Sequence, residues 1–164
     1  MKNFPTTIPV FPLSGVIYFP KTNLPLNIFE QRYLNLVNDV YKSNKLMGMV
    51  QSKREGDAVY NVGCLGKISD YRKSSDGRIL INLTGITRFK IEEEVSNKKL
   101  YREFKVSYEI FNSDLKDYFD NIETENLMDK AKKFFKKHGL LLNWKEFEKL
   151  DQAQKINTLA MISP

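Results

Sequence analysis

The 164-residue chain contains a single cysteine, Cys64, and a single histidine, His138. One cysteine excludes an internal disulfide, and the two residues together are too few soft ligands for a zinc site. No apolar run approaches the roughly 20 residues that a membrane-spanning helix needs. The apolar stretch from Ile8 to Phe19 is interrupted by Pro9 and Pro12 and is followed by no small-residue cleavage site, unlike a signal peptide. We therefore expect a soluble cytoplasmic protein with no metal, no cofactor and no membrane partner.

The sequence also lacks a nucleotide-binding loop. Such a loop needs two glycines separated by four residues, followed by a lysine and a hydroxyl-bearing residue. The stretch from Gly63 to Ile68 has two residues between its glycines and no hydroxyl after Lys67. It also has the pattern of a strand, so we expect no nucleotide there.

Two further patterns could suggest catalysis. Cys64 and His138 could form a nucleophile and base, but they fall in different parts of the chain and no third group orients them. A lone cysteine among strand residues is usually a small buried hydrophobe. The consecutive acids Glu92–Glu94 are better explained as a solvated strand end, with Lys98 and Lys99 as neighbours, than as a carboxylate pair in a cleft. We expect a protein that is not an enzyme.

Hydrophobic residues make up 41% of the chain and aromatic residues 12%, which is enough for a folded core. The net charge is +6, and it is unevenly placed. Residues 1–112 contain 17 basic and 11 acidic residues, whereas residues 113–164 contain nine of each. The residue patterns change at the same point, so we expect a β-rich domain over residues 1–112 and a helical subdomain over residues 113–164.

An early helix is expected over residues 28–42. Asn27 can cap it while Glu30 reaches back to the N–H of the cap residue, which is a capping box. Apolar residues recur at helical spacing and predict one buried face. These residues are Phe29, Tyr33, Leu36, Val37 and Val40.

The rest of the first part predicts short strands. The first 28 residues are confined to edge strands and crossovers by Pro9, Pro12, Pro20 and Pro25. Asp76–Gly77 favours a tight hairpin between strands at residues 62–72 and 78–83, with Ile79, Ile81 and Leu83 on one face. Further strands are expected at residues 46–50, 86–95 and 101–111, with a turn at residues 55–57 and a break at Thr84–Gly85.

A helix is expected to begin at Ser113, with Asp114 and Asp117 in its first turn. Gly139 has the position of a glycine that ends a helix. The expected apolar face contains Leu127, Ala131, Phe134 and Phe135, and capping boxes at Asn143 with Glu146 and at Asp151 with Gln154 predict two more helices. Trp144 and Phe147 are expected in the core of this part.

Three blocks of sequence resemble the Lon protease N-terminal, substrate-binding domain family. The first runs from Leu26 to Tyr33, the second combines residues 62–68, 76–78 and 83–89, and the third combines residues 139–144 and 157–161. The resemblance covers nearly the whole chain and is greatest to bacterial members that lack the ATPase and peptidase modules. It implies an α+β fold, with a PUA-like pseudo-β-barrel of about six strands, one inserted helix and a C-terminal helical bundle.

Members of this family usually continue with a further long helix. Here the sequence stops at Pro164, directly after an apolar face formed by Ile156, Leu159 and Ala160. We expect either a trimmed chain or a naturally short member of the family.

The resemblance implies a non-catalytic module that binds unfolded or flexible polypeptides, as an adaptor or chaperone-like factor that could recruit a protease. The apolar segment Val16, Ile17, Tyr18 and Phe19 is its candidate surface, together with Leu24 and Arg32. If the segment is a strand, alternation exposes either Ile17 and Phe19 or Val16 and Tyr18.

Two alternatives stay open. An RNA-binding PUA-like protein would use basic loops beside Tyr60 and Tyr71, and the candidate residues are Lys53, Arg54, Tyr71, Arg72, Lys73 and Arg78. A small-molecule sensor would use a pocket at the barrel mouth. Four lysines, Lys132, Lys133, Lys136 and Lys137, line one face of the expected helix, where they complement the helix dipole better than they indicate a phosphate track.

Overall fold

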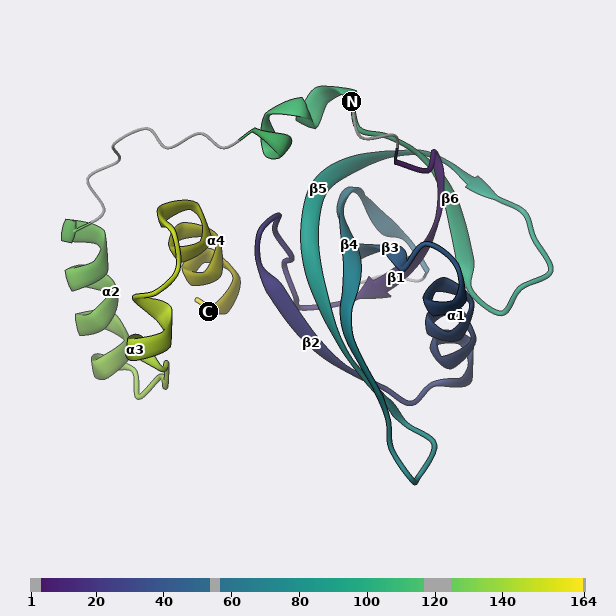
Figure 1. The fold of residues 1–164 in the computed structure, drawn as a ribbon. Helices are drawn as coiled ribbons and strands as arrows, with labels where there is room; N and C mark the ends of the chain where they lie inside the picture. The colour runs from purple at the N-terminus through teal and green to yellow at the C-terminus, as the bar shows by residue number, and fades with distance from the viewer. Residues whose placement is uncertain (1–3, 54–56, 117–124, 164) are drawn as a thin grey trace. The chain divides into compact units, whose positions relative to one another are not determined.

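The computed structural model describes residues 4–53, 57–116 and 125–163, and the chain forms two compact units, residues 1–116 and 117–164 (Figure 1). The first unit contains β1 (Thr7–Leu13), β2 (Asn23–Ile28), α1 (Gln31–Lys42), β3 (Leu46–Ser52), β4 (Val59–Lys73), β5 (Ile79–Val95), β6 (Arg102–Ser107) and the 3-10 helix η1 (Glu109–Leu115). The second unit contains α2 (Glu125–Lys137), α3 (Trp144–Phe147) and α4 (Gln152–Ile162).

The six strands form one sheet in the order β2-β5-β4-β3-β1-β6. β5 also pairs with β6, so five strands close a ring while β2 lies outside it, paired to β5. The expected barrel of about six strands is therefore only partly right. β1 and β3 are parallel, and the connection between them contains β2 and α1, as a parallel pair requires a crossover.

The interior of the ring is filled from every strand except β2. Phe89 of β5 is fully buried, and it lies against Gly48 and Gly63. A Cβ atom on either glycine would come within 2.9 Å or 2.5 Å of the Phe89 ring, so both positions must lack a side chain. The cluster around Phe89 consists of Ile8, Val10, Val50, Leu65, Phe104 and Val106.

α1 has the expected buried face, formed by Tyr33, Leu36, Val37 and Val40. Its start differs from the prediction. The residue at the cap position is Glu30, and its side chain makes no capping hydrogen bond. Asn27, the expected cap, is instead held in β2, where it pairs with Leu80.

Phe29 was expected on the buried face and is exposed instead. It lies between the end of β2 and the start of α1, so the helical spacing does not apply to it.

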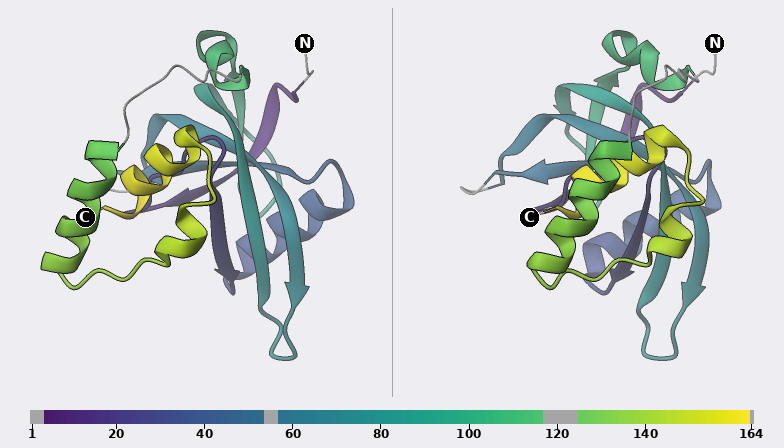
Figure 2. Two further views of the ribbon diagram at one scale, coloured as in Figure 1. Left: turned by 60° about the vertical axis from the view of Figure 1, so that its left-hand side comes forward. Right: turned by 90° about the vertical axis from the view of Figure 1, so that its left-hand side faces the viewer.

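The predicted hairpin between β4 and β5 is present, and it projects from the body of the first unit (Figures 1 and 2). Gly77 has a φ angle of +88°, and the Ser74 N–H donates to the carbonyl of Arg78 at 2.8 Å. The predicted break at Thr84–Gly85 is wrong, because β5 continues through it. The ladder instead shifts there, pairing Gly66 with Gly85, which leaves Ile86 as an extra residue in a β-bulge.

β6 ends at Ser107 rather than at residue 111, and the expected helix start at Ser113 is wrong as well. Ser113 lies inside η1, and the carboxylate of Asp114 accepts hydrogen bonds from Arg88. This strong ion pair fixes the segment after β6 in a short 3-10 turn. Asp117 lies outside the described residues.

In the second unit, Phe135, Phe147 and Leu159 are buried against one another, with Trp144 packed beside them. Gly139 has a φ angle of +65°, as a helix-terminating glycine should, and Asp151 and Gln154 form both bonds of the predicted capping box. Leu127 and Phe134 were expected on the apolar face and are exposed. Ala160 is also exposed, whereas Leu159 beside it is buried.

Candidate functional site

The candidate segment Val16–Phe19 lies between β1 and β2 and is neither strand nor helix. Tyr18 is buried and its hydroxyl donates a hydrogen bond to the carbonyl of Leu83 at 2.8 Å. The next residues are held by backbone bonds, from Lys21 N–H to Gly85 O and from Gly85 N–H to Thr22 O, both at 2.9 Å. The segment is therefore anchored on β5. Of the two predicted sets, Ile17 is exposed and Tyr18 is buried, whereas Phe19 and Val16 are both half-buried.

Two glycines of the second sequence block make this anchoring possible. A Cβ atom at Gly66 would lie 2.7 Å from the Tyr18 hydroxyl, and one at Gly85 would lie 2.2 Å from the Phe19 carbonyl oxygen. Real Cβ atoms do not approach so closely, and a backbone oxygen cannot rotate away as a side chain can. Both glycines thus serve to seat the segment on the sheet.

An apolar cavity of about 280 Å³ opens beside this segment. Its wall comes from the segment itself, from β3, from β4 and from one residue of β5. Three of the apolar side chains at its edge are strongly exposed: Ile17 at 49%, Tyr60 at 51% and Val62 at 46%. We call it the apolar cavity; its lining residues are Val16, Ile17, Tyr18, Phe19, Met49, Val50, Gln51, Tyr60, Val62, Gly63, Cys64 and Arg88.

A shift in the β3–β4 ladder exposes Tyr60 and Val62. Val50 pairs with Gly63 and Ser52 pairs with Val59, so one residue of β3 faces three residues of β4. Such a bulge bends its strand and re-aims the side chains on it. The bulge thus places two apolar side chains at the edge of the cavity.

Arg88 is the charged residue among those that line the apolar cavity. Its Nε and Nη2 atoms donate to the two carboxylate oxygens of Asp114 at 2.9 and 2.7 Å, and its backbone N–H donates to the same group. Its guanidinium carbon lies 4.6 Å from the centre of the Phe111 ring. The side-chain hydrogen bonds to Asp114 raise the pKa of Arg88 above its ordinary value, and together with the Phe111 ring they hold the side chain in one place.

Cys64 lines the cavity but is buried, and burial raises the pKa of its thiol. A thiol that stays protonated is a poor nucleophile. His138 lies in the other unit, beside Phe134. The described residues contain no group of three or more His, Cys, Asp or Glu side chains that could hold a metal ion.

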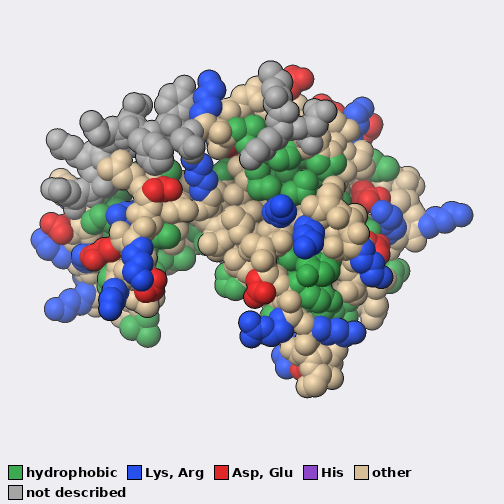
Figure 3. Space-filling view, in the orientation of Figure 1, with side chains coloured by type: hydrophobic (Ala, Val, Ile, Leu, Met, Phe, Trp, Pro, Cys, Tyr) green, Lys and Arg blue, Asp and Glu red, His purple; other side chains and the backbone are tan. Residues whose placement is uncertain are grey.

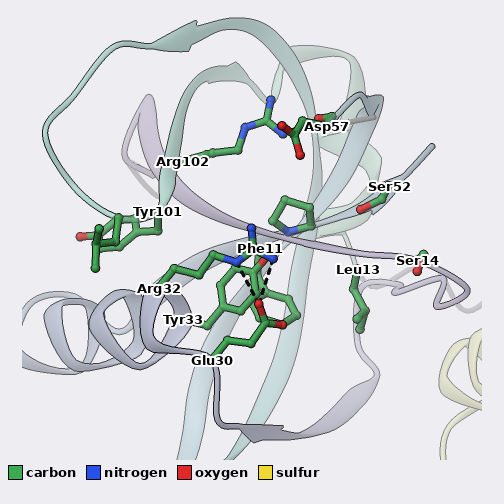
Figure 4. A pocket seen from close by; sticks show the side chains of 12 residues that line it. Phe11, Leu13, Ser14, Glu30, Arg32, Tyr33, Ser52, Asp57, Tyr101 and Arg102 are labelled. Carbon is green, nitrogen blue, oxygen red and sulfur yellow. Dashed lines mark hydrogen bonds and ion pairs between the residues drawn. The ribbon is translucent and has the colours of Figure 1, made fainter. Parts of the chain in front are cut away.

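A second, polar cavity of about 290 Å³ lies at the ends of β1 and β3 (Figure 4). Arg32 pairs with Glu30 at 2.9 Å on one side of it. On the other side Arg102 donates to the Asp57 carbonyl at 2.6 Å and forms two hydrogen bonds with Glu94, which hold the pKa of Glu94 below its ordinary value. Both guanidinium groups are thus already engaged.

The structure therefore divides the predicted polypeptide surface. Val16, Ile17, Tyr18 and Phe19 line the apolar cavity, whereas Arg32 lines the polar cavity. Leu24 lies half-buried in β2, opposite Leu83, and lines neither.

The residues predicted for RNA binding are also separated. Lysine and arginine side chains gather around the β4–β5 hairpin (Figure 3), where Arg72 pairs with Asp70 and Arg78 with Asp76. Tyr71 is stacked on Tyr41 with 4.2 Å between ring centres and donates a hydrogen bond to Asn38. Lys53 lies elsewhere, 5.6 Å from the centre of the Tyr60 ring, Lys73 lies at the hairpin turn, and Arg54 is outside the described residues.

The two other charged patterns have structural partners. Glu94 pairs with Arg102 and Glu93 with Lys105. Of the expected neighbours, Lys99 pairs with Glu103 and lines a cavity with Glu94. Lys132 pairs with Glu148, which links α2 to the segment after α3.

Sequence reasoning did not identify Met49, Tyr60, Val62 and Arg88 as parts of one cavity. Strand pairing brings them together, and the bulge in β4 has no local signature. The available signal was the alternation of Tyr60 and Val62, two apolar residues that share one side of a strand.

Comparison with known proteins supports the fold. The sequence profile of the ATP-dependent protease La (LON) substrate-binding domain matches residues 7–163. The Lon protease of Cytophaga hutchinsonii is 30% identical over 112 residues, which are 65% of this chain and 14% of that protein. The Lon protease of Dictyoglomus thermophilum is 24% identical over 146 residues, which are 86% of this chain and 18% of that protein. The chain therefore spans less than a fifth of the length of these curated relatives.

Two solved structures are similar in fold. The Lon N-terminal domain protein from Xanthomonas campestris has a TM-score of 0.62 at 20% identity, covering 98% of this chain and 100% of its own. The N-terminal domain of the Mycobacterium avium complex Lon protease has a TM-score of 0.62 at 15% identity, covering 96% of this chain and 83% of its own. No helix in the described part of the chain is long and apolar enough to cross a membrane.

Proposed function

The chain belongs to the family of the ATP-dependent protease La (LON) substrate-binding domain, and we propose that it holds unfolded polypeptide segments by accepting their apolar side chains in the apolar cavity. The observation that carries the proposal is the exposure of Ile17, Tyr60 and Val62 around one cavity. Exposed apolar patches mark interaction sites on soluble proteins. The family match supports a substrate-recognition module of this kind.

The size of the cavity favours a side chain over a small-molecule ligand. Pockets for small molecules and cofactors have volumes of about 300–1,000 Å³ and enclose most of the ligand. The apolar cavity is at the lower limit at about 280 Å³, and its edge is open enough to expose half of Ile17. It therefore suits one bulky side chain of a longer chain.

The energetics favour transient capture. Burial of one large apolar side chain contributes about 1.5–3 kcal/mol, which by itself gives weak binding and rapid release. A module of this kind can sample many sequences and pass them on. We therefore propose an adaptor or chaperone-like role in protein quality control, with a protease as the recipient.

We propose that the first unit is a PUA-like pseudo-barrel and the second a helical bundle. The closed ring of five strands supports the first description, and the buried cluster of Phe135, Phe147 and Leu159 supports the second.

The test is the affinity of the whole chain for a permanently unfolded protein. Fluorescein-labelled lysozyme, reduced and carbamidomethylated so that it cannot refold, is a suitable probe, with anisotropy as the readout. We expect Ile17→Asp to weaken binding about tenfold, because it removes about 1.4 kcal/mol or more of apolar contact. Leu80→Asp is the matched control, since Leu80 is 42% exposed on β5 and lines neither cavity.

Three outcomes would contradict the proposal. One is equal weakening by both variants, which would indicate general loss of surface hydrophobicity. Another is dissociation of a dimer by Ile17→Asp with unchanged probe affinity, which would make the cavity an interface between copies of this chain. The third is binding of RNA that falls steeply with salt, since apolar capture persists at high salt whereas phosphate contacts weaken.

A further inference from the structure

Basic side chains border the apolar cavity on the β5 side. Arg88 pairs with Cys64 across the β4–β5 ladder, and Lys90 pairs with Val62 two residues further along. Directly opposed residues project from the same face of a sheet, with Cβ atoms about 4.5–5.5 Å apart. Cys64 and Val62 both line the cavity, so Arg88 and Lys90 lie next to it on one face.

Arg88 has donors left over for a ligand. A guanidinium group carries five N–H donors, and Asp114 uses one on Nε and one on Nη2. Asp114 is 8% exposed, so it lies behind the guanidinium rather than at the surface. Arg88, which lines the cavity, therefore keeps the two donors of Nη1 and one of Nη2 beyond those that Asp114 uses.

A third cation is close by. The Lys53 ammonium lies 5.6 Å from the centre of the Tyr60 ring, and Tyr60 is at the edge of the cavity. Two carboxylates belong to the same region: Asp114, which is paired to Arg88, and Glu92, which is two residues beyond Lys90 on β5. Like Lys53 and Lys90, neither lines the cavity itself. The region around the apolar opening thus carries three cations against two carboxylates, a net charge of +1.

We propose that the apolar cavity selects polypeptide segments in which a bulky apolar side chain is flanked by acidic residues. The apolar side chain enters the cavity while neighbouring carboxylates reach Arg88 and Lys90. This inference rests on the proposed function and narrows its substrate class, because a cavity without the cations would accept apolar segments whatever their flanking charge.

The test compares three synthetic fluorescein-labelled peptides with the same central Leu-Phe pair and with aspartate, serine or lysine on both sides. We expect the whole chain to bind the aspartate peptide about threefold more tightly than the serine peptide, because exposed ion pairs each contribute only a modest attraction. The lysine peptide should bind more weakly than the serine peptide. High salt should reduce these differences, since exposed charges are screened.

Two variants locate the effect. Lys90→Gln should remove part of the preference for aspartate over serine, whereas Lys73→Gln, the same loss of charge at the hairpin turn, should leave it unchanged. Asp114→Asn keeps the shape of the side chain but no longer neutralises Arg88, so it should increase the preference for the aspartate peptide. A circular dichroism melt of each variant confirms that it folds.

The outcomes separate this inference from the function on which it rests. Equal affinity for all three peptides, with loss of binding in Ile17→Asp, would overturn the acidic preference and leave the apolar site intact. Binding of none of them, with no effect of Ile17→Asp on the unfolded probe, would overturn both. An aspartate preference that Lys73→Gln abolishes would place the acidic contacts on the hairpin and overturn the inference.

Discussion

The Tyr18 hydroxyl fixes the segment between β1 and β2 to the sheet. It donates to the carbonyl of Leu83 from a buried position, and Gly66 leaves the space that it occupies. A hydrogen bond of this kind contributes about 1 kcal/mol, and a buried carbonyl left without it is destabilising. Tyr18 thus holds Ile17 at the edge of the apolar cavity.

Tyr18→Phe should change how the stability of the protein depends on pH. Burial raises the pKa of Tyr18 above its ordinary value of 10.0, so above this pH the unfolded chain loses a proton that the folded chain retains. The contribution of Tyr18 to the free energy of unfolding is complete below about pH 10, and it falls by about 1.4 kcal/mol for each pH unit above this. Phenylalanine has no such proton. Urea unfolding should show wild type about 1 kcal/mol more stable at about pH 8, and the difference should fall to near zero by about pH 11.

The other tyrosines are present in both proteins and cancel in the difference. A difference that stayed constant across this range would mean that the Tyr18 hydroxyl is not protected in the folded state. The anchoring of Ile17 described above would then be wrong.

At the scale of residues, sequence predicts the chemistry of the site better than its orientation. The apolar run around Ile17 predicts an interaction surface. Strand alternation leaves two choices for its exposed residues, Ile17 with Phe19 or Val16 with Tyr18. The choice depends on the Leu83 carbonyl, 65 residues away in sequence, and on the shift of the ladder at Gly85. Neither can be derived from local patterns.

At the scale of elements, the seating of residues 16–22 depends on Gly85. Gly85→Ala would bring a Cβ atom within 2.2 Å of the Phe19 carbonyl oxygen, and the segment must move to relieve the contact. We expect a loss of stability of about 1–3 kcal/mol and weaker binding of the unfolded probe. Urea unfolding and anisotropy measure the two effects.

Gly77→Ala is the control for this prediction. Gly77 has a positive φ angle in the hairpin turn, and a Cβ atom there would meet no neighbour. The substitution should cost about 1–2 kcal/mol through backbone strain alone and should leave probe affinity unchanged. Wild-type affinity in Gly85→Ala would contradict the role assigned to the segment.

Elements with strong local signals are predicted correctly from sequence. The β4–β5 hairpin has its Asp-Gly turn, α4 has its capping box, and α1 has its apolar spacing. The errors occur where tertiary contacts override a local preference. Asn27 pairs with Leu80 in the β2–β5 ladder and therefore does not cap α1. The carboxylate of Asp114 accepts hydrogen bonds from Arg88 and does not mark the start of a helix.

At the scale of the whole molecule, every residue that lines the apolar cavity belongs to the first unit. The assignment of residues 1–112 and 113–164 to two domains stays a prediction. If it is right in outline, a chain of residues 1–116, which keeps the Arg88–Asp114 ion pair, should unfold cooperatively and bind the unfolded probe as tightly as the whole chain. Non-cooperative thermal unfolding, or a large loss of affinity, would show that the second unit is needed for the fold or for the site.

The most direct test of the central claim is a methyl NMR titration of the whole chain with the unlabelled aspartate-flanked peptide. We predict saturable shifts at the methyl groups of Ile17, Met49 and Val62, with one dissociation constant and no shift at Leu80. Shifts confined to Leu13 and Leu100, beside the polar cavity, or to Leu127 and Leu141 of the second unit, would contradict the central claim. So would the absence of any saturable shift.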